Sequence, residues 1–346
     1  MIPQEKSDAV LRALNETFGT SEYDAISPMT GGHTTSLVFR IIVRGRPYLL
    51  KLIVRRDNPT LHYASMRAAA EAGIAPRVLY ANVEDQISIT DFVNAKPLSA
   101  AEALVRLPRL LRNLHAVPPF GRAPYNTTCT YLLNREPGSD AYLRKFLAAE
   151  ILPEAERAEY SAVLSELTAT YPHDDGEMVS SHNDLFKPDN ILFDGERVWL
   201  VDWEAAFLND RYADLAVVAD QVAANGDEET GFLREYFAAP PDAYQLARIH
   251  LMQQIAHLFY TMAFLFAGSA GRPIDWTPTV PEFSEYQQQM WTGKIDLGSN
   301  EGKLIAGRVH WERLRYNVRQ ARYRDALEIV SNRHRGECTN VQGVAS

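Results

Sequence analysis

The sequence predicts an α+β protein of two lobes, in which a small antiparallel sheet is followed by a mostly helical region. β-rich runs separated by turn signals predominate before residue 93, and apolar residues at helical spacing predominate after Ser99. The length of 346 residues suits two or three lobes, at about 100 to 200 residues per domain. We expect an N-terminal lobe over 1–93, a C-terminal lobe over 94–330 and a flexible tail over 331–346.

The sheet of the first lobe is predicted from two β-rich runs, LVFRIIV (37–43) and YLLKLIV (48–54), which flank Arg44-Gly45-Arg46-Pro47. Glycine and proline between apolar runs indicate a hairpin, so Lys51 is expected inside a strand. The other expected elements of this lobe are a helix over 61–72, strands over 76–80 and 86–90, and a connector over 91–97.

The second lobe is predicted to consist mainly of helices, because its apolar residues recur at a helical period. The expected helices are 99–115, 140–152, 154–168, 212–225, 244–267 and 303–330. Residues from Ser331 onward are polar and aperiodic, which predicts a frayed tail.

A second hairpin is predicted within the helical lobe. Asp194-Gly195 lies between ILF (191–193) and VWLV (198–201), and Asp-Gly between apolar runs is a strong hairpin signal. If 194–197 form the loop, Phe193 lies opposite Val198.

The same register brings polar residues together at the open end of this hairpin. Asn190 lies opposite Val201, so Asp202 stands one step beyond, and Asp184 is a short loop upstream. Because neighbouring strands are about 4.7 to 4.9 Å apart, Asn190 and Asp202 could share one Mg²⁺ ion, which prefers oxygen ligands. Taken singly, such acids are more often structural: Asp184 and Asp189 would cap turns, and Asp202 would end a surface strand. A carboxylate at the end of a buried strand, however, needs a cation or several donors.

Composition excludes several classes of protein. The formal charge of −9 argues against binding to nucleic acid or an anionic membrane, and is compatible with a cationic substrate. Cys129 and Cys338 lie far apart and lack metal-ligand spacing, so no disulfide scaffold is expected. The most apolar run, 256–267, is shorter than the roughly 18 residues of a membrane span, and no secretory signal is visible. We expect a cytoplasmic enzyme.

The catalytic segment resembles the signature of the aminoglycoside phosphotransferase and choline kinase family, relatives of the protein kinases. The resemblance rests on HND (182–184), NIL (190–192) and VDWE (201–204). Similar family segments are GGHTT (31–35), LKL (50–52), GIAP (73–76), ITDFV (89–93), LRNLH (111–115) and DRYADLA (210–216). The resemblance covers about residues 30–220 and implies a bilobal, protein-kinase-like fold.

Membership of this family would make the protein an ATP-dependent kinase, in which positioning and charge neutralisation do most of the catalysis. By resemblance, Lys51 holds the α- and β-phosphates, and Asn190 and Asp202 hold Mg²⁺. Asp184 accepts the proton of the substrate hydroxyl, and His182 organises the catalytic loop. The resemblance also implies a set of nucleotide-binding residues: Gly31, Gly32, Thr34 and Thr35 over the phosphates, and the backbone of Thr90, Asp91 and Phe92 at the adenine.

Three features depart from the family pattern. Asp189 occupies the position where the family usually has asparagine, so either Asp189 or Asn190 is the metal ligand; we favour Asn190, because a strand follows it directly. The helix over 61–70 contains no acid to pair with Lys51, and His62 lies about where that acid would be. Lys51 therefore has an atypical partner, or is held by Asp202 and phosphate alone. The absence of an Ala-Pro-Glu motif after Asp202 favours a small-molecule kinase over a protein kinase.

Trp203-Glu204 is similar to the choline and ethanolamine kinase branch, and aromatic residues interleaved with acids follow Tyr244. Aromatic faces bind ammonium groups, so the predicted acceptor is a cationic amino alcohol, contacted by Asp184, Glu204, Asp210 and Trp311. The alternatives are an aminoglycoside or another hydroxyl-bearing metabolite. A catalytically weak nucleotide-binding pseudokinase is a further alternative. A metal-dependent hydrolase using His182 and Asp184 is less favoured, because the other histidines are scattered singly.

Overall fold

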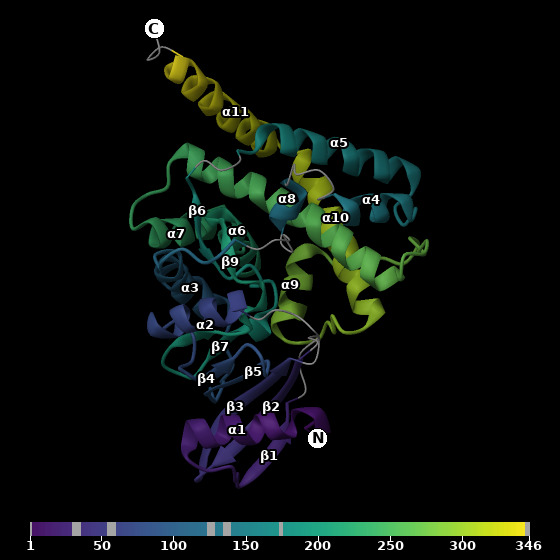
Figure 1. Ribbon diagram of the computed structural model, residues 1–346. Coiled ribbons are helices and arrows are strands. Elements are labelled where there is room, and N and C mark those ends of the chain that lie inside the picture. Colours follow the sequence, from purple (N-terminus) through teal and green to yellow (C-terminus); the bar gives the residue numbers. More distant parts are fainter. Residues whose placement is uncertain are drawn as a thin grey trace.

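The computed structural model describes residues 2–29, 36–53, 60–122, 129–133, 140–172 and 176–342, with side chains to residue 333. It confirms the predicted α+β architecture of a small antiparallel sheet followed by a helical region (Figure 1). The sheet lies at one end of the molecule with the N-terminus, and the bulk of the helices lies at the other (Figure 1). The sheet ends at Asp91 and the first helix after it begins at Ala100, so the predicted lobe boundary at residue 93 falls in the connection between them.

The first lobe contains a five-stranded antiparallel sheet in the order β1-β2-β3-β5-β4. Its strands are β1 (Ala25–Pro28), β2 (Ser36–Val43), β3 (Arg46–Ile53), β4 (Val78–Asn82) and β5 (Ile87–Asp91). The predicted hairpin is confirmed, since Val43 pairs with Arg46. Lys51 lies inside the sheet, between Val38 of β2 and Ser88 of β5.

Two helices cover this sheet. Helix α1 (Ser7–Phe18), which the sequence analysis did not predict, contributes Ala13 and Leu14 to a core shared with Leu50 and Leu52 of β3. Because side chains alternate along a strand, Lys51 projects from the opposite face. Helix α2 (Thr60–Glu71) matches the expected helix over 61–72.

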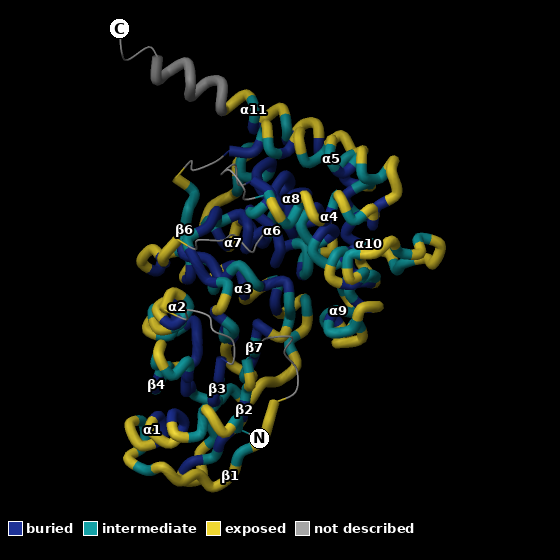
Figure 2. The backbone as a smooth tube through the Cα atoms, turned by 45° about the vertical axis from the view of Figure 1, so that its right-hand side comes forward, coloured by how far each residue is buried: buried dark blue, intermediate teal, exposed yellow. Residues whose placement is uncertain are grey.

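The second lobe is built around α8 (Ala243–Ser269), a helix that is largely buried (Figure 2). It packs against α6, α10 and α11. The other helices of this lobe are α3 (Ala100–His115), α4 (Ala141–Ala148), α5 (Glu154–Thr170), α6 (Arg211–Val222), α7 (Gly226–Phe237), α9 (Phe283–Trp291), α10 (Asn300–Val318) and α11 (Ala321–Gln342). Across the described ranges, we find no helix long and apolar enough to span a membrane.

Two short strand pairs carry the catalytic segment. The predicted hairpin is confirmed as β7 (Ile191–Phe193) and β8 (Val198–Leu200), with Phe193 opposite Val198. The amide of Val201 donates to the carbonyl of Asn190 at 3.0 Å, which extends the pairing as expected. The second pair, β6 (Met178–Ser181) with β9 (Phe207–Asp210), was not predicted, because its partners are distant in sequence and no tight turn joins them.

Three predictions for the helices were incomplete or wrong. The helix expected over 303–330 is interrupted after Val318, which separates α10 from α11. Helix α11 continues as far as Gln342, into the segment expected to be a frayed tail, whose flexibility stays a prediction. Helix α7 was missed although Asn225 marks its start: the Asn225 side chain accepts hydrogen bonds from the amides of Asp227 and Glu228.

The packing of α8 on α10 depends on a glycine. A β-carbon at Gly307 would lie 2.7 Å from Cγ of Leu265, so we expect Gly307→Ala to destabilise the protein by about 1 to 3 kcal/mol through overpacking. Gly231 in α7 is the matched control, because a β-carbon there meets no heavy atom within 4 Å. Gly231→Ala should stabilise the protein by up to about 1 kcal/mol through helix propensity. Urea unfolding of both variants measures the difference, and equal effects would contradict this packing.

Candidate active site

The two lobes are joined by an ion-pair cluster around Lys51. Its Nζ lies 2.6 Å from Oδ1 of Asp202 and 2.7 Å from Oε1 of Glu204, both of which follow β8 in the second lobe. Ser36 of β2 also donates to Glu204, at 2.9 Å. Burial lowers the pKa of Lys51, but the two carboxylates outweigh burial and leave its pKa raised. Lys51 is therefore a cation fixed between two acids.

Glu204 is the partner that Lys51 lacks in the N-lobe helix. Glu204 belongs to η4 (Trp203–Ala205), a short 3-10 helix against which α2 packs. No acid is present in the first turn of α2. Of the two possibilities left open by the sequence, the structure shows an atypical partner, which reaches Lys51 from the second lobe.

Asp202 adopts a left-handed backbone conformation, with φ of 67°. This region is uncommon for residues other than glycine and often occurs where a side chain is held in a functional position. Burial raises the pKa of the Asp202 carboxyl, but the charge of Lys51 outweighs it and leaves the pKa lowered. The carboxylate is therefore ionised and available to a cation.

Asp184 is the second acid of the site. Lys187 Nζ lies 3.0 Å from its Oδ2, and Nδ2 of Asn190 donates to the same oxygen at 3.1 Å and to the Asp184 carbonyl at 2.7 Å. Asn190 is 4% exposed, whereas Asp189 points to solvent. The structure therefore brings together Asp184 and Asn190, and leaves Asp189 outside the site.

One buried carboxylate holds the loop that carries Asp184. Asp214 of α6 accepts hydrogen bonds from the backbone amides of His182 and Asn183, each at 2.8 Å. Its Oδ2 also lies 3.3 Å from Nε2 of His115. Burial raises the pKa of Asp214, but these hydrogen bonds, that of His115 first, outweigh it and leave the pKa lowered. The loop is thereby built around a negative charge that water does not reach.

His182 links this loop to the hairpin. Its Nε2 lies 2.9 Å from the carbonyl oxygen of Val201, next to Asp202, and the side chain is fully buried. The ring is therefore in contact with the backbone of the hairpin, and its role as the organiser of the loop stays a prediction. Asn183, with φ of 66°, donates to the carbonyls of Ala205 and Phe207 and ties down the segment that follows.

The expected nucleotide-binding residues are only partly described. Thr90 and Asp91 lie in β5, and the Asp91 carboxylate pairs with Arg77. The guanidinium of Arg40 lies 5.2 Å from the centre of the Phe92 ring. Gly31, Gly32, Thr34 and Thr35 lie outside the described residues.

Two of the expected substrate residues have structural positions instead. Trp311 has no exposed surface and packs against Tyr160 in the core of the helical lobe. Asp210 forms an ion pair of 2.7 Å with the fully buried side chain of Arg248 and caps α6. The expected substrate contacts of Trp311 and Asp210 are therefore wrong, because neither side chain has room for a ligand. The sequence analysis also missed Asp214 and Lys187 as parts of the site.

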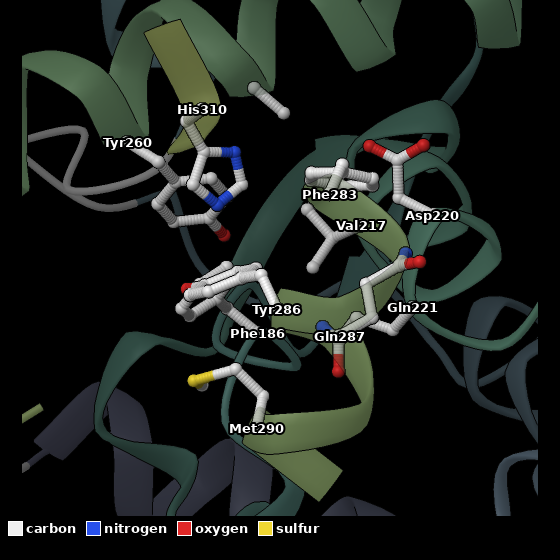
Figure 3. Close-up of a pocket in the computed structure, with 11 residues that line it drawn as sticks. Phe186, Val217, Asp220, Gln221, Tyr260, Phe283, Tyr286, Gln287, Met290 and His310 are labelled. Carbon is white, nitrogen blue, oxygen red and sulfur yellow. The ribbon is translucent and has the colours of Figure 1, made fainter. Parts of the chain in front are cut away.

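A narrow aromatic pocket lies beside the catalytic loop (Figure 3). Phe186, two residues after Asp184, forms one wall and stacks at 4.2 Å between ring centres with Tyr260 of α8. After burial, the charge of Asp184 is among the influences that raise the pKa of Tyr260, so the two side chains are electrostatic neighbours. The residues lining the pocket are Phe186, Val217, Asp220, Gln221, Ala256, Tyr260, Phe283, Tyr286, Gln287, Met290 and His310. The pocket is thus apolar and aromatic, with one carboxylate.

A small sheet with an inward lysine, joined to a helical lobe with a buried catalytic loop, defines a kinase-like phosphotransferase. Residues 25–249, more than half of the chain, match the model of the phosphotransferase enzyme family (APH). The chain belongs to this family, and it is a phosphotransferase that acts on a hydroxyl group.

Solved structures of low sequence identity share the fold. A choline/ethanolamine kinase family protein from Mesorhizobium loti aligns with a TM-score of 0.64 at 21% identity, over 94% of this chain and 99% of that one. The choline kinase LicA from Streptococcus pneumoniae aligns with a TM-score of 0.55 at 14% identity, over 84% and 98%. A spectinomycin phosphotransferase, in complex with ADP and spectinomycin, aligns with a TM-score of 0.52 at 13% identity, over 87% and 98%. No curated protein matches the sequence significantly.

The buried Asp214 carboxylate should stabilise the protein in a pH-dependent way. Asp214→Asn removes the charge that three donors share, and should destabilise the protein by about 3 kcal/mol. Because the folded pKa of Asp214 is lowered, its contribution is present above the unfolded value of about 3.9 and is lost as pH falls through the folded pKa. The free energy of unfolding of the variant should therefore depend less on pH below about 4. Asp227→Asn, on the exposed first turn of α7, is the control, and a loss as large there would contradict this role.

Proposed function

We propose that this protein is an ATP-dependent kinase that phosphorylates the hydroxyl group of a small cationic amino alcohol. The observation that carries the proposal is the position of Asp184. Its carboxylate is held by Asn190 and Lys187, and the same loop forms a wall of the aromatic pocket. A general base and a site for an ammonium group are therefore adjacent.

The nucleotide would bind between the lobes. Lys51, inside β3 and fixed by the acids after β8, supplies a cation for the α- and β-phosphates. By resemblance to the family, the adenine would lie against the backbone of Thr90, Asp91 and Phe92, where the sheet ends and the connection to the second lobe begins. Gly31, Gly32, Thr34 and Thr35, which precede β2 in the sequence, would cover the phosphates.

Asp202 and Asn190 have side chains that suit a magnesium ion. Asp202 has an ionised carboxylate. Nδ2 of Asn190 donates to the Asp184 carboxylate, so the amide oxygen of Asn190 points away from Asp184. In the described part of the chain no three His, Cys, Asp or Glu side chains form a metal-binding group. Mg²⁺ usually has few protein ligands, and phosphate oxygens and water complete its coordination. Asn190 and Asp202 would hold the ion, which neutralises charge on the triphosphate, and no hydrolase-like metal cluster accompanies His182.

Asp184 would accept the proton of the attacking hydroxyl. Asn190 would orient the Asp184 carboxylate. Lys187, whose Nζ lies 3.0 Å from that carboxylate, would balance negative charge on the transferred phosphoryl group. Such groups contribute by position and electrostatics, because phosphoryl transfer needs little covalent chemistry from the protein.

The aromatic pocket supports a cationic acceptor. Ring faces attract ammonium groups, at roughly 0.5 to 2 kcal/mol per contact depending on desolvation. Asp220 lies at the wall of the pocket and supplies a compensating charge. An aminoglycoside is a larger acceptor, and the narrowness of this pocket favours a small one. Retention of Asp184, Asn190 and Asp202 together favours an active enzyme over a pseudokinase.

The role of Asp184 is tested by a pair of amide substitutions. Asp184→Asn should lower kcat at least about 100-fold, because it removes the proton acceptor, and should leave ATP binding unchanged in a thermal-shift titration. Asp189→Asn is the matched control in the same loop and should retain nearly full kcat, because this residue faces solvent. ADP release with an amino alcohol acceptor measures both. Full turnover by the Asp184 variant, or a loss confined to the Asp189 variant, would refute the assignment.

The role of Glu204 is tested through the nucleotide. Glu204→Gln removes one of the two charges beside Lys51 and should lower kcat/KM for ATP about tenfold, equivalent to about 1.4 kcal/mol. Glu301→Gln, at the exposed start of α10, should have no effect. Steady-state kinetics with ATP varied gives the comparison; an unchanged kcat/KM would show that Asp202 alone suffices to position Lys51.

A further inference from the structure

Three titratable side chains lie next to one another at the aromatic pocket, and two of them, Asp220 and His310, line it. Oδ2 of Asp220, on α6, lies 3.3 Å from Nε2 of His257, on α8. Nδ1 of His257 lies 2.8 Å from Nδ1 of His310, on α10. His257 is fully buried and His310 is 4% exposed. His257 and His310 are thus joined by a hydrogen bond, and the Asp220 carboxylate lies beside His257 without hydrogen-bonding to it.

The donor and the acceptor in the hydrogen bond between His257 and His310 can be assigned. Burial lowers the pKa of His310 to about 3 and that of His257 well below its ordinary value, so both rings are neutral. In a contact between two neutral Nδ1 atoms, one donates and the other accepts. When Asp220 is ionised, its charge, 3.3 Å away, favours a proton on Nε2 of His257, so Nδ1 of His257 accepts a hydrogen bond from Nδ1 of His310. Nε2 of His310 is then a hydrogen-bond acceptor.

The acceptor faces an aromatic enclosure. Nε2 of His310 has no hydrogen-bond partner among the described residues, although the side chain is buried. Its ring lines the pocket, 5.1 Å from Tyr260, 5.4 Å from Phe186 and 5.8 Å from Tyr286, measured between ring centres (Figure 3). A buried acceptor without a donor is rare in proteins. In a pocket lined mainly by rings, it is the group available to fix the orientation of a polar ligand.

We infer that the ammonium group of the acceptor carries at least one N–H, which donates to Nε2 of His310 while the rings and Asp220 stabilise its charge. This inference rests on the proposed function. A quaternary ammonium presents only methyl groups to Nε2 and leaves the buried acceptor unsatisfied. The pocket therefore selects amino alcohols of the ethanolamine type, with up to two N-methyl groups, against choline.

The charge of the ligand supports the required arrangement of protons. Burial raises the pKa of Asp220 to about 7; Arg313 and Arg322 oppose the shift and Glu229 adds to it. A protonated Asp220 would no longer favour the proton on Nε2 of His257, and the opposite arrangement makes Nε2 of His310 a donor, which repels an ammonium. A bound cation favours the ionised carboxylate, and so the acceptor form of His310.

The test is a panel of acceptors at saturating MgATP: ethanolamine, N-methylethanolamine, N,N-dimethylethanolamine and choline, with ADP release and product mass both measured. N,N-dimethylethanolamine and choline differ only in that choline has a third N-methyl group in place of the N–H. We expect kcat/KM for N,N-dimethylethanolamine to exceed that for choline at least about 100-fold. Values within about threefold of each other would overturn the inference while leaving the proposed kinase intact. If no member of the panel is phosphorylated, the proposed function fails and the inference fails with it.

Substitution of His310 tests whether this residue causes the preference for N,N-dimethylethanolamine over choline. His310→Phe keeps a ring of similar shape without the acceptor, and should reduce the preference for N,N-dimethylethanolamine to less than about tenfold by lowering kcat/KM for that substrate rather than for choline. His250→Phe is the matched control, because His250 is also a buried histidine with a lowered pKa but does not line this pocket. ATP-induced thermal stabilisation shows that each variant is folded. An unchanged preference in folded His310→Phe would overturn the role of His310, and the wild-type panel decides the substrate class if that variant does not fold.

Discussion

The structure depends on the charge balance around Lys51. One ammonium group from the sheet is placed between Asp202 and Glu204 of the helical lobe, so the position of each lobe is tied to that of the other. Partly buried charges are costly unless paired, and removing the lysine would leave two carboxylates close together. The arrangement requires that β3 direct Lys51 away from its own core and that Asp202 adopt its left-handed turn. A triphosphate with its metal ion would meet both a cation and acids at this point, which is what nucleotide binding between two lobes requires.

A second constraint fixes the catalytic loop from behind. Asp214 gathers the amides of His182 and Asn183, and His182 in turn contacts the carbonyl of Val201 beside Asp202. Asp184 and Asp202 are therefore carried by segments that share one buried network. Preorganisation of this kind places reacting groups before the substrate arrives and reduces the reorganisation needed during the reaction. The pocket beside Asp184 depends on the same principle, because a buried hydrogen bond between His257 of α8 and His310 of α10 holds its polar wall.

Local signals in the sequence predicted much of this fold and of the candidate site. The Asp-Gly turn fixed the register of the second hairpin, and this register alone brought Asn190 and Asp202 to one end. Contacts between distant segments carried no such signal. Glu204 became the partner of Lys51 through the packing of α2 on η4, and Asp214 reached the loop from a helix. The prediction for Trp311 failed because an aromatic residue at helical spacing is usually part of a core, and here it has no exposed surface.

The central claim is that this protein transfers the phosphoryl group of ATP to a small alcohol rather than to water. The most direct measurement is ³¹P NMR of MgATP and ethanolamine incubated with the protein. The account predicts that a phosphomonoester resonance grows in proportion to ADP and is absent when ethanolamine is omitted. ADP accompanied only by inorganic phosphate, or intact ATP for this acceptor and for its N-methylated forms, would contradict it.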